Sequence, residues 1–344
     1  MKAFFCLIVK YFKMEKYKKE EQISLVKSKF AKELSGRLHL IKVEAPLLVE
    51  KGTGVNDDLN GIESPVSVSI NNIPSKKFEI VHSLAKWKRE KLAKLGAKPE
   101  QGIYTDMRAI RTDEVLTELH SVYVDQWDWE KVISSEDRNL DYLKATVSKI
   151  YESIKSVAFE LTEKYGIVSE LPPAITYLHT EDVLELYPNL TAKERENEIC
   201  KKYGAVFLIG IGGVLADGKA HDGRASDYDD WSSETSTGYR GLNGDLLLWN
   251  PVLNKAIEIS SMGIRVDKES LLRQLQIAGN EDRKNLDWHK ALIDGKLPQT
   301  IGGGIGQSRL AMFLLRKRHI GEVQSSVWNF DKEIYSNENQ LNIL

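Results

Sequence analysis

The sequence predicts an α+β fold in which a mostly antiparallel sheet is flanked by helices. Amphipathic helical patterns occupy residues 20–40 and 138–165, whereas strand patterns gather in the C-terminal half. The two types do not alternate as they do in βαβ units, so a parallel sheet is disfavoured. No repeat, low-complexity tract or Pro/Ser-rich linker interrupts the chain. We therefore expect a single domain over residues 14–344, with a helical insertion around 138–165.

The N-terminal part of the sequence contains one long helical pattern. Residues 1–13 precede a second methionine, Met14, and a polar run, so we expect them to form an extension outside the fold. The helix that follows is expected over about residues 20–40, with Gly36 near its end as part of the stop signal. Pro46 is expected to end a short strand at residues 41–46. The helix is predicted from apolar residues at three- and four-residue spacing, namely Ile23, Val26, Phe30, Leu34 and Leu38.

The following elements are predicted in the same way, from apolar periodicity and from turn residues. A turn-rich polar loop at 52–61 precedes a strand at 78–81 and a helix at 84–95. An arginine-bearing turn then leads into a strand-like run at 121–129. After the helix at 138–165, the expected elements are strands at 205–210, 245–249 and 256–261 and helices from about 268 and at 306–315.

Composition excludes several classes of protein. The 344 residues are 42% hydrophobic and 28% charged, as in an ordinary globular protein. The formal net charge of −2 provides no general basic field for a nucleic acid. Two cysteines, Cys6 and Cys200, cannot form a disulfide framework, which favours a cytoplasmic setting. No apolar run approaches the roughly 18 residues of a membrane span, so we expect no membrane association.

The strongest chemical signal is the glycine-rich segment at residues 302–309. Glycines at a strand-to-helix junction allow a ligand to approach the backbone closely, and Arg309 adds a cation one helical turn further on. This pattern suits a nucleotide, although a plain glycine turn before a helix is the alternative. The segment matches neither a Walker loop nor a Rossmann fingerprint. The glycines concerned are Gly302, Gly304 and Gly306.

Polar residues also occur at alternating positions within predicted strands. Alternation places Glu258 and Ser260 on one face of their strand, with Ile257 and Ile259 on the other. A carboxylate of this kind suits Mg²⁺, which binds one or two carboxylates together with phosphate oxygens. The same device puts Gln126 and Asp128 on one face, and Lys88 lies near a helix start. The alternative for each is a solvated surface position.

Three segments in order resemble the motifs of the class II aminoacyl-tRNA synthetase fold: residues 43–46, 111–114 and 302–309. From about residue 22 to residue 328 the chain is still more similar to the ammonia-dependent asparagine synthetase family, the A type of aspartate-ammonia ligase. The segments that carry this resemblance are 81–89, 120–130, 227–231, 241–245, 260–266 and 299–309.

The resemblance implies an ATP-dependent synthesis of L-asparagine from L-aspartate and ammonia, through a β-aspartyl adenylate, with release of AMP and pyrophosphate. Such an enzyme must gather two anionic reactants and neutralise the charge that grows on phosphorus. By resemblance, Arg111 bridges the reacting carboxylate and the α-phosphate, and Glu258 and Asp245 hold Mg²⁺. A homodimer built across the first motif, with Pro46 near its axis, is implied as well.

The resemblance also assigns residues to ATP. Arg309 is expected to lie against the adenine and the phosphates, with the glycines at 302, 304 and 306 beside it. Asp113 and Glu114 both stand near the position of the synthetase glutamate that contacts adenine, and the sequence does not choose between them.

A comparison with aspartyl-tRNA synthetases predicts how aspartate binds. Those enzymes anchor the side-chain carboxylate with a lysine and an arginine, and the spacings to Lys88 and Arg265 are the same here. If the anchors persist while the chemistry moves to the β-carboxylate, they hold the α-carboxylate instead. Asp128 or Asp229 then accepts the α-ammonium. The resemblance also assigns Ser261 to aspartate, and Asp57 and Gln126 to the incoming ammonia.

Two other functions compete with this interpretation. An aspartyl- or asparaginyl-tRNA synthetase is disfavoured because neither an anticodon-binding domain nor a basic surface is evident. A non-catalytic, synthetase-like regulator is disfavoured because Arg111, Glu258 and Arg309 are all present. We therefore expect a cytoplasmic, dimeric ligase that binds no nucleic acid.

Overall fold

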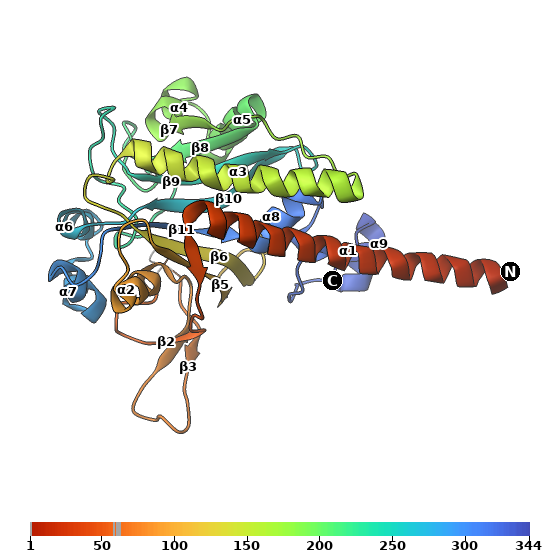
Figure 1. Cartoon of the computed structure of the whole chain (residues 1–344), viewed down its shortest axis with the longest axis horizontal. Helices are drawn as coiled ribbons and strands as arrows, with labels where there is room; N and C mark the ends of the chain where they lie inside the picture. Colours follow the sequence, from red (N-terminus) through yellow and green to blue (C-terminus); the bar gives the residue numbers. More distant parts are fainter. Residues whose placement is uncertain (1, 58, 60–62) are drawn as a thin grey trace.

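An eight-stranded sheet runs through the centre of the molecule, with the strand order β1-β5-β6-β11-β10-β9-β8-β7 (Figure 1). The computed structural model describes residues 2–57, 59 and 63–344, with side chains from residue 16 onward. The strands of this sheet are β1 (Leu40–Lys42), β5 (Gly102–Ile110), β6 (Tyr123–Val132), β7 (Thr176–His179), β8 (Ala205–Ile209), β9 (Asn243–Asn250), β10 (Lys255–Ile264) and β11 (Thr300–Gly306).

The sheet is mostly antiparallel, which confirms the predicted α+β class. Its two outermost pairs, β1 with β5 and β7 with β8, are parallel. The five pairs between them are antiparallel. The parallel pairs form across long connections: α4 (Thr180–Leu186) and α5 (Ala192–Tyr203) lie between β7 and β8, as a parallel crossover requires.

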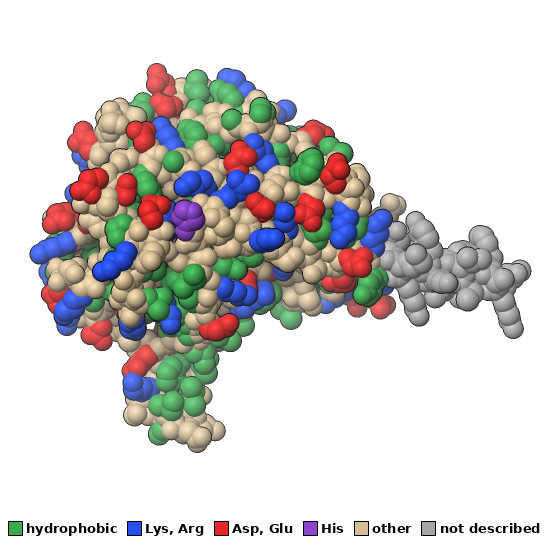
Figure 2. Space-filling view, viewed as in Figure 1, with side chains coloured by type: hydrophobic (Ala, Val, Ile, Leu, Met, Phe, Trp, Pro, Cys, Tyr) green, Lys and Arg blue, Asp and Glu red, His purple; other side chains and the backbone are tan. Residues whose placement is uncertain are grey.

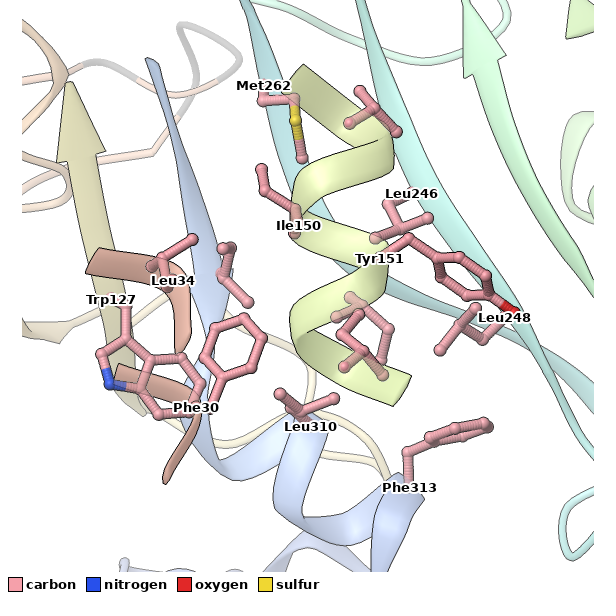
Figure 3. Packing of buried hydrophobic residues seen from close by; sticks show 14 of the residues in the cluster. Phe30, Leu34, Trp127, Ile150, Tyr151, Leu246, Leu248, Met262, Leu310 and Phe313 are labelled. Atoms are coloured by element: carbon pink, nitrogen blue, oxygen red, sulfur yellow. The ribbon is translucent and has the colours of Figure 1, made fainter. Parts of the chain in front are cut away.

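Three helices cover one face of the sheet and build the main hydrophobic core there. These are α1 (Lys2–Leu38), α3 (Leu140–Tyr165) and α8 (Gln307–Leu314), with α1 and α3 side by side. The predicted apolar stripe of α1 is buried in this core, as is the stripe of α3. Figure 3 shows Phe30 against Trp127, whose ring centroids lie 4.5 Å apart. Burial of these stripes explains why both helices are evident from periodicity alone.

The N-terminal helix differs from its predicted limits. It begins at Lys2, well before the predicted residue 20, and it ends at Leu38, two residues before the predicted limit at residue 40. His39, with φ of 59°, takes the left-handed conformation that follows the helix. The boundary predicted after residue 13 falls where side chains lie outside the described residues, so the N-terminal extension stays a prediction.

The opposite face of the sheet is only partly covered. There α2 (Ala85–Leu95) packs mainly on β5 and β6, and α5 packs on β8, β9 and one end of β10. Between them the middle strands are left open, which creates the space for a site. The remaining helical elements are α6 (Lys268–Ile277), η1 (Glu281–Asn285), α7 (Asp287–Ile293), η2 (Ile320–Glu322) and α9 (Lys332–Asn339).

A second, small sheet projects from the body of the molecule (Figure 1). Its strands are β2 (Leu48–Glu50), β4 (Phe78–Ile80) and β3 (Ser67–Val68), in the order β2-β4-β3. The loop that follows β2 contains the described residues 52–57 of the predicted turn-rich segment. This small sheet therefore places that loop beside the open part of the large sheet.

The surface carries both signs of charge. On the face drawn in Figure 2, Lys and Arg side chains are interspersed with Asp and Glu side chains. Within the part of the chain that the structure describes, no helix has the length and apolar character needed to cross a membrane.

We predict that Phe30→Ala lowers the free energy of unfolding by about 3 to 5 kcal/mol, because it leaves a cavity against Trp127 in a fully buried part of the core. Urea unfolding followed by tryptophan fluorescence measures the change. Lys32→Ala, at an exposed position of the same helix, is the control, and its free energy of unfolding should be close to that of the wild type. Equal stability of the two variants would contradict the packing described.

Candidate active site

A cavity of about 390 Å³ lies over the open middle of the sheet. Its floor is formed by β6, β11, β10 and β9, and its walls by the loop after β2, the start of α2, the turn after β5 and the loop at 222–229. Most of the residues predicted for the site meet here: Asp57, Lys88, Arg111, Asp113, Glu114, Gln126, Asp128, Asp229, Asp245, Glu258, Ser261, Arg265 and Gly304.

A second cavity of about 210 Å³ continues from the first, since Arg111, Glu114 and Glu258 line both. Gly306 and Arg309 line this second cavity. The predicted nucleotide residues are thus divided between two connected spaces.

Strand alternation brings Gln126 and Asp128 of β6 into the cavity, as predicted, while Trp127 points into the core on the other face. The next residue in this phase, Glu130, is fully buried beneath the cavity. Sequence analysis missed Glu130, although the same alternation could have identified it.

The prediction that Glu258 and Ser260 share a face was wrong. A β-bulge between these two residues shifts the register of β10 against β9, so the alternation changes phase. Ser261 therefore lines the cavity with Glu258. Ser260 instead is buried and donates a hydrogen bond to the carbonyl of Gly304 at 2.9 Å.

The glycines of β11 make room for polar side chains of the neighbouring strands. A Cβ on Gly304 would overlap the Gln126 side chain, and one on Gly302 would overlap the Glu130 carboxylate and lie 2.7 Å from Arg265 Nη2. Gly302 lines neither of the two cavities. It was predicted as a nucleotide contact, but the structure places it against a buried ion pair.

That ion pair belongs to a buried charge network under the cavity floor. Arg265 contacts Glu130 with Nη2 at 2.8 Å and Nε at 3.1 Å, and it also pairs with Asp229. Lys88 Nζ lies 3.2 Å from Asp128 and 3.9 Å from Glu130. One carboxylate, Glu130, thus lies between the two cations.

The network changes the pKa values of its members. Burial alone would raise the pKa of Glu130, but Arg265 and Lys88 outweigh it and hold the pKa below the ordinary 4.5. Burial lowers the pKa of Lys88, against the opposing effect of Asp128. Arg265 stays charged, because its carboxylate partners overcome the effect of burial and raise its pKa.

Arg224 is a cavity residue that sequence analysis missed. Its Nη2 lies 2.6 Å from Asp245 Oδ1, and its Nη1 contacts Ser261 Oγ. Burial and the nearby charge of Glu258 raise the pKa of Asp245 to about 6 despite Arg224. An arginine within a loop rich in glycine and aspartate was the only sequence signal for it.

Arg111 and Glu114 face both cavities from the turn after β5. Arg111 Nη2 donates to the carbonyl of His82 at 3.1 Å, whereas its Nε is buried and makes no hydrogen bond to a described residue. Burial raises the pKa of Glu114. The neighbouring Asp113 accepts a hydrogen bond from the Ser64 amide at 2.9 Å.

Asp57 is a buried carboxylate at the cavity wall, 2% exposed. It accepts hydrogen bonds from Ser83 Oγ at 2.9 Å and from the Leu59 amide at 3.0 Å. It forms no ion pair with any described residue, and burial raises its pKa. It is thus a carboxylate able to receive a cationic or proton-donating ligand.

The donor set can accommodate a magnesium ion only together with a ligand. In the described part of the chain, no three His, Cys, Asp or Glu side chains come together as a complete metal cage. Asp245 and Glu258 line the same cavity, and the charge of Glu258 helps to raise the pKa of Asp245. Two carboxylates completed by phosphate oxygens match the coordination that Mg²⁺ prefers.

This sheet, with its cavity, defines the class II aminoacyl-tRNA synthetase fold. Asparaginyl-tRNA synthetase of Entamoeba histolytica in complex with asparaginyl-adenylate superimposes with a TM-score of 0.65 at 16% identity, over 92% of this chain and 68% of that one. The asparaginyl-tRNA synthetase of Pyrococcus horikoshii, also complexed with asparaginyl-adenylate, superimposes with a TM-score of 0.66 at 16% identity, over 89% of this chain and 68% of that one. Aspartyl-tRNA synthetase of Entamoeba histolytica superimposes with a TM-score of 0.57 at 14% identity, over 88% of this chain and 57% of that one.

Within this class, the chain is assigned by its sequence. The family model for aspartate-ammonia ligase matches residues 17–340. The protein belongs to the aspartate-ammonia ligase family and is therefore a ligase.

We predict that Glu130→Gln lowers the free energy of unfolding at neutral pH by about 3 to 5 kcal/mol, because it leaves two buried cations short of a partner. The pKa of Glu130 is depressed, so its charge stabilises the fold above pH 4.5, and this contribution is lost as the pH falls through the lower folded-state pKa.

The difference in the free energy of unfolding between wild type and Glu130→Gln should therefore become smaller below pH 4.5. Urea unfolding at neutral and at acidic pH measures this difference. Glu163→Gln, at an exposed position of α3, is the control. An undiminished difference in acid would show that the Glu130 charge does not stabilise the fold.

Proposed function

We propose that this protein makes L-asparagine from L-aspartate, ATP and ammonia through an enzyme-bound β-aspartyl adenylate. Membership of the family supports the overall reaction. The observation that carries the mechanism is that one cavity collects four groups: the buried cation pair Lys88 and Arg265, the ligand-facing Arg111, and the Asp57 carboxylate, which forms no ion pair with any described residue. These are the groups needed for an anionic amino acid, a nucleotide and an ammonium ion.

The reaction proceeds in two steps. An oxygen of the aspartate β-carboxylate attacks the α-phosphorus of ATP, and the bond to the bridging oxygen of pyrophosphate breaks. Ammonia then attacks the β-carbonyl carbon, the bond from that carbon to the phosphate oxygen breaks, AMP leaves and the nitrogen loses a proton. The first step makes a poor electrophile reactive, and each step needs stabilisation of charge on oxygen.

Aspartate binds with its α-carboxylate on Lys88 and Arg265, which leaves the β-carboxylate free to face ATP. Of the two candidate acceptors for the α-ammonium, Asp229 is favoured, because its Oδ2 is buried without a hydrogen-bond partner among the described residues. Asp128 already accepts from the Leu84 amide and from Lys88. Ser261 contributes a hydroxyl beside these groups.

ATP occupies the connected cavities, with Arg111 between the α-phosphate and the reacting carboxylate. Glu114 contacts the adenine, since it faces both cavities whereas Asp113 is bound to Ser64. The remaining nucleotide contacts are Gly304, Gly306 and Arg309. Asp245 and Glu258 hold Mg²⁺, which when bound neutralises phosphate charge. Acidic side chains outnumber basic ones in the lining, so a polyphosphate needs such a cation.

Ammonium binds at Asp57 with Gln126 nearby. The raised pKa of the buried Asp57 makes its carboxylate a better proton acceptor. Asp57 takes a proton from ammonium, and the resulting ammonia attacks the adenylate.

The remaining parts of the proposal concern the whole molecule. The catalytic domain spans residues 14–344, and residues 1–13 form an extension. The chain acts as a homodimer across the segment that ends at Pro46, it is located in the cytoplasm, and it binds no nucleic acid. The free, buried Cys200 is in keeping with a reducing compartment.

We predict aspartate-dependent exchange of labelled pyrophosphate into ATP, with AMP as the nucleotide product of asparagine synthesis. Arg111→Ala and Arg309→Ala should each lower turnover by about 10²-fold or more, as expected for the loss of a transition-state donor. Arg316→Ala, a partly exposed arginine outside both cavities, is the control. ADP as product would refute the mechanism, and unchanged turnover in the two variants would refute their roles.

We predict that Arg265→Ala weakens aspartate binding by about 2 to 4 kcal/mol, the cost of losing a buried, charge-assisted partner, with a far smaller effect on ATP. β-Alanine, which lacks the α-carboxylate, should scarcely be activated, and succinate should fail because an acidic acceptor is left unpaired. Calorimetric titrations with aspartate and with ATP measure the two affinities, and retained ATP binding shows that Arg265→Ala is folded. A complex with the β-carboxylate on Lys88 and Arg265 would overturn the orientation.

A further inference from the structure

The loop that carries Asp57 packs against α7, an element with no residue in the cavity lining. The amide of Trp288 donates to the carbonyl of Thr53 at 3.2 Å. Gly54, with φ of +80°, lies so close to α7 that an added Cβ would be 2.9 Å from both His289 Nδ1 and Leu286 Cβ. The backbone of this loop therefore packs at Gly54 directly against the His289 ring.

His289 is in turn held by a buried charge cluster centred on Asp227. Asp227 Oδ2 lies 2.9 Å from His289 Nε2 and 2.8 Å from both Lys86 Nζ and Arg283 Nη2. Lys86, His289 and Asp227 are each no more than 2% exposed. Burial alone would raise the pKa of Asp227, but Lys86 and His289 bring it down to about 2.

The cluster joins segments that meet at Asp57. Lys86 lies on α2, close to Lys88, and Asp227 belongs to the loop that also contains Asp229. On the other side of the loop, Asp57 accepts from Ser83, and the Asn56 side chain accepts from the amide of His82 at 2.9 Å. Among the proposed site residues, Asp57 is the one whose own loop packs directly on α7. Lys88 and Asp229 are linked to α7 indirectly, through Lys86, whose carbonyl accepts from Trp288 Nε1, and through Asp227, which contacts His289.

We propose that His289, held by Asp227, is a positioning residue that keeps the Asp57 loop in place for the attack of ammonia and is not needed for formation of the adenylate. This inference rests on the proposed function. A misplaced Asp57 leaves the adenylate open to water, which attacks the β-carbonyl carbon in place of ammonia. The products are then aspartate and AMP, with no asparagine.

The test separates the two steps of the reaction. In His289→Ala, aspartate-dependent pyrophosphate exchange should stay within about twofold of wild type, while KM for ammonium rises about tenfold or more, as expected when a reacting group is misplaced. The ratio of AMP to asparagine should rise above one. Gly54→Ala, which displaces the loop from the same ring without touching Asp227, should give the same pattern.

Two further variants serve as rescue and control. His289→Gln retains an amide donor toward Asp227. It should restore part of the coupling of AMP formation to asparagine formation. Lys290→Ala, at an exposed position of the same helix, should behave as wild type in every assay.

The outcomes distinguish this inference from the function on which it rests. Loss of exchange and of amidation to the same extent in both His289→Ala and Gly54→Ala would overturn the positioning role, as would normal coupling in both. Absence of aspartate-dependent exchange in the wild type would overturn the proposed function, and this inference with it.

Discussion

The site depends on the burial of two basic groups, Lys88 and Arg265, inside the protein. Transfer of an unpaired charge from water to a protein interior costs several kcal/mol even after relaxation. Glu130 lies between the two cations, and Asp128 and Asp229 supply a further carboxylate to each. These partners hold both cations at the cavity floor, where an anionic ligand can use their charge.

The neighbouring strand is adapted to this network. A side chain at Gly302 would overlap the Glu130 carboxylate, so β11 needs a glycine where it lies beside the charged residues of β6. The conformational freedom of glycine is less important at this point than its small volume. The same holds at Gly304, where the missing side chain leaves space for Gln126 and for a ligand. A glycine-rich strand beside a charged strand is thus one structural unit.

The two faces of the large sheet perform different tasks. One face is sealed by α1, α3 and α8 over a large apolar core, and this burial provides most of the favourable free energy of folding. The other face carries the charges, which cost stability and are tolerated because the core offsets them. Alternation lets β10 present Glu258 to the cavity and Ile257 and Ile259 to the core, and the β-bulge then turns Ser261 toward the cavity beside Glu258. Acidic residues dominate the lining around Asp245, so charge balance there depends on Arg224 or on a bound cation.

The sequence by itself determined the fold class, the limits of α3 to within two residues, and most of the residues that line the cavity. Long amphipathic helices repeat one apolar spacing many times, and motif residues lie close together along the chain, so both signals are local. Strands β2, β3, β5 and β7 and helices α4, α5, α7 and α9 were missed. Apart from β5 and α5 these are short elements, which carry few periods of the apolar pattern.

Tertiary structure alone decided which face Ser260 and Ser261 occupy, that Gly302 packs on an ion pair, and that Glu130, Arg224 and His289 stand around the site. The physical reason is that each of these depends on a partner distant in the sequence. A bulge, a close approach and a buried charge pair are properties of two segments together, and no pattern within one segment records them.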